Sequence, residues 1–241
     1  MLEPLRLRFG APSLAPVFDA ALRPGDTFVD IGANIGVYAM WAARLVGDRG
    51  RVFAFEPVPG TRAQLERNVV ENGFSQVEVV PKGVGAEPST LTLHVVPGSS
   101  GLSSRYARDD AASVAVEVEV ATLDAFFAGR AAPRAMKIDV EGMELDVLRG
   151  AAGLLASPTP PAIVFEAHAP HFDRAGTTYA SILAYLRDAG GYRVFALGPR
   201  GVCAESVDAV RPGSGDVLAV RTGWGPHDEL LARLSRVRFQ L

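Results

Sequence analysis

F-V-D-I-G-A-N-I-G, at Phe28–Gly36, carries the strongest structural signal in the 241-residue sequence. The run Thr27–Ile31 is short, apolar and bounded by turn residues, which is typical of a buried strand. Gly32 and Gly36 allow a tight turn and a close approach of the backbone to a ligand. Apolar residues at helical spacing over Asn34–Val46 then predict a helix. The segment therefore predicts a strand, a glycine turn and a helix in direct succession.

The sequence on the C-terminal side continues this alternation. Strands are expected at Arg51–Phe55 and Val77–Val80, and a helix over Thr61–Asn72 lies between them. Later strands are expected at Ala135–Asp139, Ala162–Glu166, Tyr192–Ala196 and Val217–Val220, and helices over Met143–Gly150, Tyr179–Ala189 and Asp228–Arg236. Strands that alternate with helices predict an α/β fold, with a Rossmann-like, doubly wound and mostly parallel sheet.

One part of the chain breaks the alternation. Leu91–Val96 and Val114–Val120 each alternate apolar and polar residues, and the Gly/Ser-rich segment Gly98–Ser104 lies between them. This pattern predicts an antiparallel hairpin with a long mobile loop, inserted at about residues 84–121. We expect residues 1–24 to form an N-terminal lead-in segment and residues 25–241 to form a single domain.

Composition limits the possible partners and location. With 48% hydrophobic residues, the chain can form one large domain with a core. The formal net charge of -3 argues against a protein that binds nucleic acid by neutralising phosphates. Cys203 is the only cysteine, so no intrachain disulfide can form. The sequence shows neither a signal peptide nor a run of about 18 apolar residues. We therefore expect a cytoplasmic protein with no nucleic-acid or membrane partner.

The ends of the first strands predict a nucleoside site, because ligands of open parallel sheets bind beyond the carboxyl ends of the strands. Asp30 places a carboxylate beside the glycine turn, which disfavours a pyrophosphate and suits a cationic aminoacid-sulfonium ligand. Glu56 ends the second strand and can accept hydrogen bonds from both hydroxyls of an adenosine ribose. The third strand ends near Gly83, where the adenine is expected.

Several segments in order resemble one known family. They are F-V-D-I-G-A-N-I-G at Phe28–Gly36, F-E-P at Phe55–Pro57, G-S-S-G-L-S-S at Gly98–Ser104, T-L-D at Thr122–Asp124, K-I-D-V-E-G at Lys137–Gly142 and L-R-G at Leu148–Gly150. This combination is similar to the FkbM-type family of class I S-adenosylmethionine (SAM)-dependent methyltransferases, over about residues 25–168. The first and the K-I-D-V-E-G motifs are the most specific.

The resemblance implies a seven-stranded class I sheet with a reversed last hairpin. It also implies SAM as the methyl donor, S-adenosylhomocysteine (SAH) as its product, and usually an oxygen acceptor such as a hydroxyl of a secondary metabolite or sugar. By motif position, the methionine part should be surrounded by Asp30, Gly32, Asn34 and Gly36, and the ribose should be held by Glu56. Further cofactor-binding candidates are Pro57, Gly83, Ser103, Ser104 and Asp139.

Candidate catalytic residues follow the fourth and fifth strands. Asp139 ends the fourth strand and Glu141 lies two positions later; Glu166 ends the fifth strand, with His168 and His171 beyond it. One of Asp139, Glu141, Glu166 and His168 could remove the acceptor proton, and the pKa of a histidine suits this role. Alternatively, Asp139, Glu166 and His168 could bind a divalent metal such as magnesium. A third possibility is that both histidines are ordinary surface residues.

Other readings remain open. Glu144 and Asp146 are expected on a solvated helix face. A nicotinamide-dependent oxidoreductase predicts G-x-G-x-x-G and Tyr-x-x-x-Lys, and neither motif occurs. A non-catalytic SAM-binding partner protein also fits the cofactor motifs, but the full retention of Asp30, Glu56, Asp139 and Glu166 argues against it. The expected acceptor is a small molecule with a hydroxyl group, and a homodimer through the edge strands of the hairpin is possible.

Overall fold

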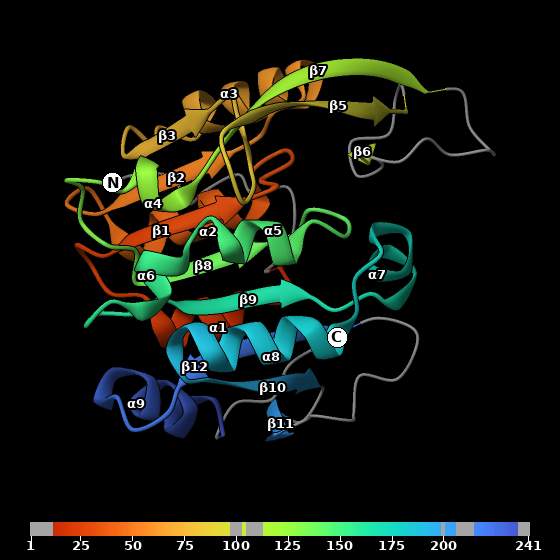
Figure 1. Cartoon of the computed structure of the whole chain (residues 1–241). Helices are drawn as coiled ribbons and strands as arrows, with labels where there is room; N and C mark the ends of the chain where they lie inside the picture. The colour runs from red at the N-terminus through yellow and green to blue at the C-terminus, as the bar shows by residue number, and fades with distance from the viewer. Residues whose placement is uncertain (1–11, 97–102, 105–112, 199–200, 206–214, 236–241) are drawn as a thin grey trace.

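A twisted sheet of eight strands runs through the molecule in the order β11-β10-β12-β9-β8-β1-β2-β3 (Figure 1). Its strands are β1 (Thr27–Ile31), β2 (Arg51–Phe55), β3 (Val77–Val80), β8 (Ala135–Ile138), β9 (Ala162–Glu166), β10 (Tyr192–Gly198), β11 (Gly201–Glu205) and β12 (Asp216–Arg221). The computed structural model describes residues 12–96, 103–104, 113–198, 201–205 and 215–235.

Strand directions confirm the predicted class I arrangement. β3, β2, β1, β8 and β9 pair in parallel. β12 is antiparallel to both β9 and β10, which gives the reversed last hairpin. The seven predicted strands are all present, and β11 adds an eighth by pairing antiparallel with β10.

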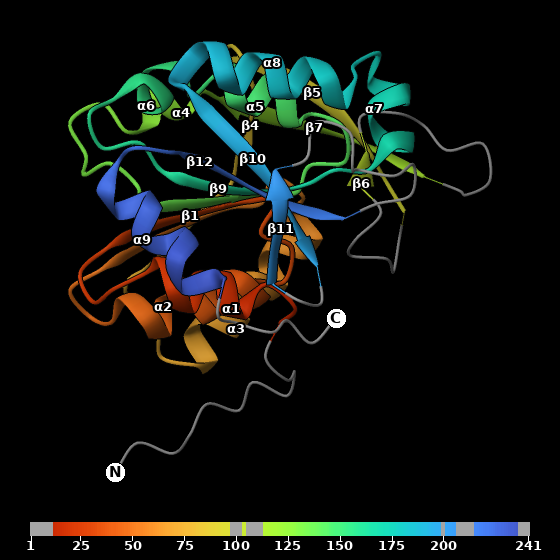
Figure 2. The same ribbon diagram turned by 90° about the horizontal axis from the view of Figure 1, so that it is seen from below.

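Helices cover both faces of the sheet, as the view from below shows (Figure 2). One face carries α1 (Ala15–Ala21), α2 (Val37–Val46), α3 (Pro59–Glu71) and α9 (Gly225–Leu234). The other carries α4 (Leu123–Phe126), α5 (Glu144–Arg149), α6 (Ala152–Ala156) and α8 (Tyr179–Gly190). α7 (Ala169–Ala175) lies beyond the carboxyl end of β9. None of the described helices is long and apolar enough to cross a membrane.

The alternation of side chains along each strand divides the core into two layers. On β1, Phe28 belongs to the core under α1 and α2, whereas Val29 and Ile31 belong to the core under α5 and α8. Phe18 of α1 is fully buried. Its ring packs edge-on against the ring of Phe28, with the two ring centres 5.0 Å apart. Part of the predicted lead-in segment thus packs on the core, while the division at residue 25 stays a prediction.

The inserted hairpin forms a second sheet of four strands in the order β4-β7-β5-β6. β5 (Ser89–Val95) and β7 (Val114–Ala121) pair antiparallel, which confirms the predicted hairpin. β4 (Gly83–Val84) joins β7 in parallel, and β6 (Ser103–Ser104) joins β5. Most of the predicted mobile loop, Gly98–Ser104, lies outside the described residues. β5 and β7 extend past the main sheet at its carboxyl-end side (Figure 1).

Candidate active site

The turn after β1 is held in a conformation that requires glycine. Gly32 has φ 76° and Gly36 has φ 91°, both in the left-handed region. A Cβ atom on Gly32 would lie 2.0 Å from the carbonyl oxygen of Asp139, and one on Gly36 would lie 2.3 Å from Leu65 Cδ1. The absence of side chains therefore lets the turn pack directly against the end of β8. Because Asn34 is also left-handed, with φ 52°, α2 begins at Val37 rather than at the predicted Asn34.

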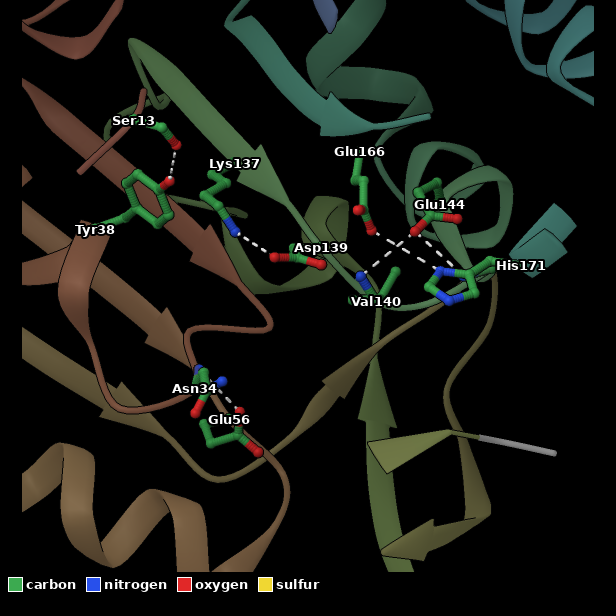
Figure 3. Close-up of polar contacts among 11 residues, drawn as sticks. Ser13, Asn34, Tyr38, Glu56, Lys137, Asp139, Val140, Glu144, Glu166 and His171 are labelled. Atoms are coloured by element: carbon green, nitrogen blue, oxygen red, sulfur yellow. Dashed lines mark hydrogen bonds and ion pairs between the residues drawn. The ribbon is translucent and has the colours of Figure 1, made fainter. Parts of the chain in front are cut away.

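Glu56 lies at the end of β2 and is almost fully buried, with 6% of its surface exposed. Its Oε2 accepts a hydrogen bond from the Asn34 N–H at 3.0 Å (Figure 3). Its Oε1 accepts one from the Val58 N–H at 2.9 Å. Burial raises the pKa of Glu56 to about 7, although the two N–H groups oppose this rise. Each carboxylate oxygen can accept more than one hydrogen bond, so both can still bind a ligand hydroxyl.

Lys137 and Asp139 form an ion pair at the end of β8. The Lys137 side chain is 6% exposed, and its Nζ lies 2.8 Å from Asp139 Oδ2 (Figure 3). Nζ also lies 4.8 Å from the centre of the Tyr38 ring. Burial alone would lower the pKa of Lys137, but the carboxylates of Asp139 and Asp30 outweigh it and raise this pKa. Lys137 is therefore held as a buried cation.

Asp30 is 1% exposed, and neither of its carboxylate oxygens has a hydrogen-bond partner in the described part of the chain. Burial raises the pKa of Asp30 to about 6, and the nearby Lys137 limits this rise. A carboxylate without a hydrogen bond is costly to bury. The Lys137 charge is the main group that compensates it, and the backbone N–H of Ala39 contributes as well.

A cleft opens between these strand ends and the inserted sheet, and it encloses about 850 Å³ between protein atoms, open solvent included. Seven predicted site residues line it, namely Gly32, Asn34, Glu56, Pro57, Gly83, Asp139 and Glu141. Asp30 and Gly36 are not among its lining residues. The side chains of Ser103 and Ser104 lie outside the described residues. The cleft thus joins most cofactor candidates to two of the catalytic candidates.

The turn between β8 and α5 is organised around Glu144. Its side chain is buried, and its Oε1 accepts hydrogen bonds from the N–H groups of Val140 at 3.4 Å and Gly142 at 3.2 Å (Figure 3). Burial raises the pKa of Glu144 to about 7. The prediction that Glu144 faces solvent is therefore wrong, because the turn needs an acceptor for these two N–H groups. Glu141, at φ 49°, is placed by this turn at the cleft.

Glu166 and two histidines form a second group next to this turn. Glu166 Oε2 lies 3.8 Å from His171 Nδ1 (Figure 3). The rings of His168 and His171 meet edge to face, with their centres 4.2 Å apart. Burial and the Asp139 carboxylate raise the pKa of Glu166, while His168 and Lys137 oppose the rise. At 17% exposure, the His171 side chain is not an ordinary surface histidine.

α7 holds this group against the K-I-D-V-E-G turn. A Cβ atom on Gly142, which has φ 106°, would lie 2.6 Å from the His171 carbonyl oxygen. Gly142 therefore lets the first turn of α7 approach the loop that carries Glu141. His168 is the N-cap residue of α7, so that His168 and His171 are neighbours on one helical turn.

Asp216 is a site residue that the sequence analysis missed. It begins β12 directly opposite Glu166 in the antiparallel register. Burial raises its pKa to about 6, with Asp139 and Glu166 adding to the rise and Lys137 opposing it. Only strand pairing reveals this placement, because an antiparallel strand begins at the edge where its parallel neighbours end.

The structure gives the magnesium hypothesis no support. In the part of the chain that the structure describes, no group of three or more His, Cys, Asp or Glu residues is placed to hold a metal ion. Asp139 is instead paired with Lys137, and Glu166 lies nearest to His171. Both carboxylates therefore already lie beside a basic side chain of the protein.

Comparisons with known proteins find methyltransferases. "Methyltransferase 1" of Beauveria bassiana is 32% identical over 154 residues, which cover 55% of this chain and 61% of that protein. The 31-O-demethyl-FK506 methyltransferase FkbM of Streptomyces tacrolimicus is 30% identical over 158 residues, covering 54% of this chain and 60% of that protein. The chain therefore spans about three fifths of the length of these relatives. Shorter matches, covering 35% and 36% of the chain, are to ribosomal RNA large subunit methyltransferases E.

Among solved structures, the chain is similar to a methyltransferase FkbM from Methylobacillus flagellatus. The TM-score is 0.51 at 19% sequence identity, over 81% of this chain and 44% of that one. This likeness supports the fold alone. A family model described as methyltransferase FkbM domain matches residues 30–194, which is more than half of the sequence. Together with the glycine turn and the K-I-D-V-E-G turn that line the cleft, this match shows that the chain belongs to the methyltransferase FkbM domain family.

Proposed function

We propose that the chain is a SAM-dependent methyltransferase that methylates a hydroxyl of a small molecule, such as a secondary metabolite or a sugar. The observation that carries the proposal is Glu56, a buried carboxylate that two backbone N–H groups fix at the wall of the cleft. Its free lone pairs suit the two hydroxyls of a ribose. Family membership supports methyl transfer as the reaction.

In this proposal, the cofactor lies across the carboxyl ends of β1, β2 and β8. Glu56 binds the ribose, with Pro57 beside it, and Gly83 lies toward the base. Gly32, Asn34 and Asp139 surround the amino-acid part. The buried Asp30 carboxylate does not line the cleft and attracts the ammonium and sulfonium charges of the cofactor over a longer distance. When bound, SAM supplies a methyl group that is activated by the positive charge on its sulfur. Gly36 acts through the shape of the turn. Ser103 and Ser104 remain candidates on sequence grounds alone.

The chain must also orient the acceptor and take up its proton. Asp139, Glu141, Glu166 and His168 remain the candidates for this step. We add His171 to them, because it is the histidine nearest to the Glu166 carboxylate. In this assignment Glu166 orients His171 and stabilises its charged form after proton uptake, while Lys137 fixes the position of Asp139.

The small-molecule acceptor is supported by the name of the Streptomyces tacrolimicus relative, a 31-O-demethyl-FK506 methyltransferase, and by the formal charge of -3. The ribosomal RNA relatives favour a nucleic-acid acceptor as the second candidate. They match only about a third of the chain, and a phosphate backbone requires basic residues that the net charge does not supply. Cytoplasmic location and a homodimer stay predictions from the sequence.

Titration calorimetry tests the cofactor assignment. Wild-type protein is titrated with SAM and SAH, with NADH as the control ligand. We expect micromolar binding of SAH and no binding of NADH. A folded sample that binds neither SAM nor SAH would contradict the proposal, as would a sample that binds NADH instead.

The proton-transfer assignment is tested by turnover, with tritium-labelled SAM and a panel of hydroxylated metabolites. His171→Gln and Glu166→Gln are expected to lower the rate by roughly 10²- to 10⁴-fold, the usual contribution of a general base. SAH affinity should stay within about twofold, because neither residue lines the cofactor cleft. His94→Gln, on the inserted sheet, is the matched control. An unchanged rate in both site variants would contradict the assignment.

A further inference from the structure

The inserted sheet has one apolar face and one polar face. Residues paired across an antiparallel ladder lie on the same side of the sheet, and Leu91 pairs with Val118 while Leu93 pairs with Val116. The residues between them point to the other side, where Glu117 and Glu119 are exposed. Burying the apolar face of this sheet against another part of the molecule or a ligand is therefore favourable.

That apolar face forms a wall of the cleft. Four of its side chains, Leu91, Leu93, Val118 and Val120, are among the lining residues. Leu93 and Val118 are 8% and 6% exposed, and they form a small core with Val58. Because the Val58 N–H also donates to Glu56, the apolar wall begins beside the carboxylate that is assigned to the ribose.

One close glycine contact holds the base of the hairpin together, and a second holds it against the main body. A Cβ atom on Gly85 would lie 2.9 Å from Val120 Cγ1, and one on Gly150 would lie 2.0 Å from the Gly85 carbonyl oxygen. The hairpin can therefore sit only at this short distance from the end of α5. Its apolar face is set in place by the packing of the backbone near Gly85 and Gly150.

We propose that Leu91, Leu93, Val118 and Val120 form one wall of the site for the adenine base of the cofactor, with Val84 at its base. This inference rests on the proposed function and extends it, because it makes the inserted hairpin a cofactor-binding element. A flat purine gains from contact with branched aliphatic side chains, which remove its faces from water. Lys82, which also lines the cleft, is ion-paired with the exposed Glu119 at 2.9 Å.

The test compares two valines on the same strand and the same face. Val118 lines the cleft, whereas Val116 is not among its lining residues. SAH is titrated calorimetrically into wild-type protein, Val118→Ala, Leu93→Ala and Val116→Ala. We expect Val118→Ala and Leu93→Ala to weaken SAH binding about three- to tenfold, as the loss of one or two buried methyl contacts implies. Val116→Ala should stay within about twofold of wild type.

Thermal unfolding of the ligand-free variants separates loss of the wall from loss of the fold. Val118→Phe, which fills the cleft rather than emptying it, is expected to lower SAH affinity more than about thirtyfold while keeping a cooperative transition. The inference is overturned if Val118→Ala and Val116→Ala have equal SAH affinity, or if Val118→Phe binds like wild type. If wild-type protein itself binds no SAH, the proposed cofactor is wrong, and the adenine assignment falls with it.

Discussion

At the scale of single residues, the candidate site contains buried carboxylates whose pKa values are raised. Glu56 is held by two backbone N–H groups, and burial still raises its pKa to about 7. A ribose donates its hydroxyl protons, so it prefers the ionised carboxylate as its partner. In the proposed function, a proton and the ribose of the cofactor therefore compete for Glu56 near neutral pH.

This competition gives a prediction for cofactor binding. The SAH affinity of wild-type protein is expected to fall as pH is lowered from 8.5 to 6.5, because Glu56 takes up a proton with a pKa of about 7. Glu56→Gln should bind SAH more weakly at high pH and lose most of this pH dependence. Calorimetry at four pH values measures both effects, and Glu66→Gln on the exposed side of α3 is the control. If SAH affinity changes with pH equally in wild type and in Glu56→Gln, the proposed binding of the ribose by Glu56 is contradicted.

The sequence predicted Glu56 as an acid at the end of a strand, because a single helix and a single strand separate it from the glycine turn along the chain. It could not predict the partners of Glu166. His171 and Asp216 come close to Glu166 only through the fold of α7 and the antiparallel start of β12. Contacts between residues that are distant in sequence depend on strand order and register, which local patterns do not contain.

At the scale of elements, the turn after β1 determines where the ends of β1 and β8 meet. Gly32 has a left-handed φ and also faces the Asp139 carbonyl oxygen. These are two separate constraints, of backbone conformation and of space. A second glycine, Gly191 after α8, has φ 66° and no atom within 4 Å of the Cβ position, so it carries only the first constraint.

Substituting alanine at both glycines separates the two constraints. Gly191→Ala is expected to lower the free energy of unfolding by about 1–2 kcal/mol, the cost of a left-handed non-glycine residue. Gly32→Ala should cost clearly more and abolish SAH binding, because β1 and β8 must move apart at the cleft. Chemical denaturation and SAH titration of both variants make the comparison. Equal destabilisation of the two would show that the contact with Asp139 has no energetic importance.

Sequence patterns predicted the buried strands well and the short helices poorly. β1, β2, β3 and β9 have the predicted bounds, since a buried run framed by turn residues is a local signal. The helices that the sequence analysis missed are α1, α4, α6 and α7, which have four to seven residues each. Two turns or fewer show too little periodicity to be told from a loop, and such helices form mainly through tertiary packing.

At the scale of the whole molecule, buried acids gather at one edge of the sheet. Asp30, Glu56, Glu144 and Asp216 each have a pKa raised to between about 6 and about 7 by burial. All four lie near the carboxyl ends of the parallel strands. Charging them at neutral pH costs folding free energy, so the chain gives up stability to keep these carboxylates at one edge of the sheet.

Glu144 allows this cost to be measured without changing a residue that lines the cleft. Its folded pKa is raised from 4.5 to about 7, so its contribution to stability is fully present below pH 4.5 and is lost as pH rises through 7. The free energy of unfolding of wild-type protein should therefore fall between pH 5 and pH 8. Glu144→Gln keeps a neutral acceptor for the N–H groups of Val140 and Gly142 but cannot become charged.

Relative to wild type, Glu144→Gln is expected to gain up to about 3 kcal/mol of stability between pH 5 and pH 8, because a tenfold difference in acidity between the folded and unfolded states corresponds to about 1.4 kcal/mol. Urea denaturation at four pH values measures how the free energy of unfolding changes with pH in wild-type protein and in Glu144→Gln. Asp146→Asn, on the same helix with a partly exposed carboxylate, is the control and should follow the wild-type slope. If Glu144→Gln also follows that slope, the Glu144 carboxyl group is not a source of the pH dependence, and the cost must lie with the acids nearer the cleft.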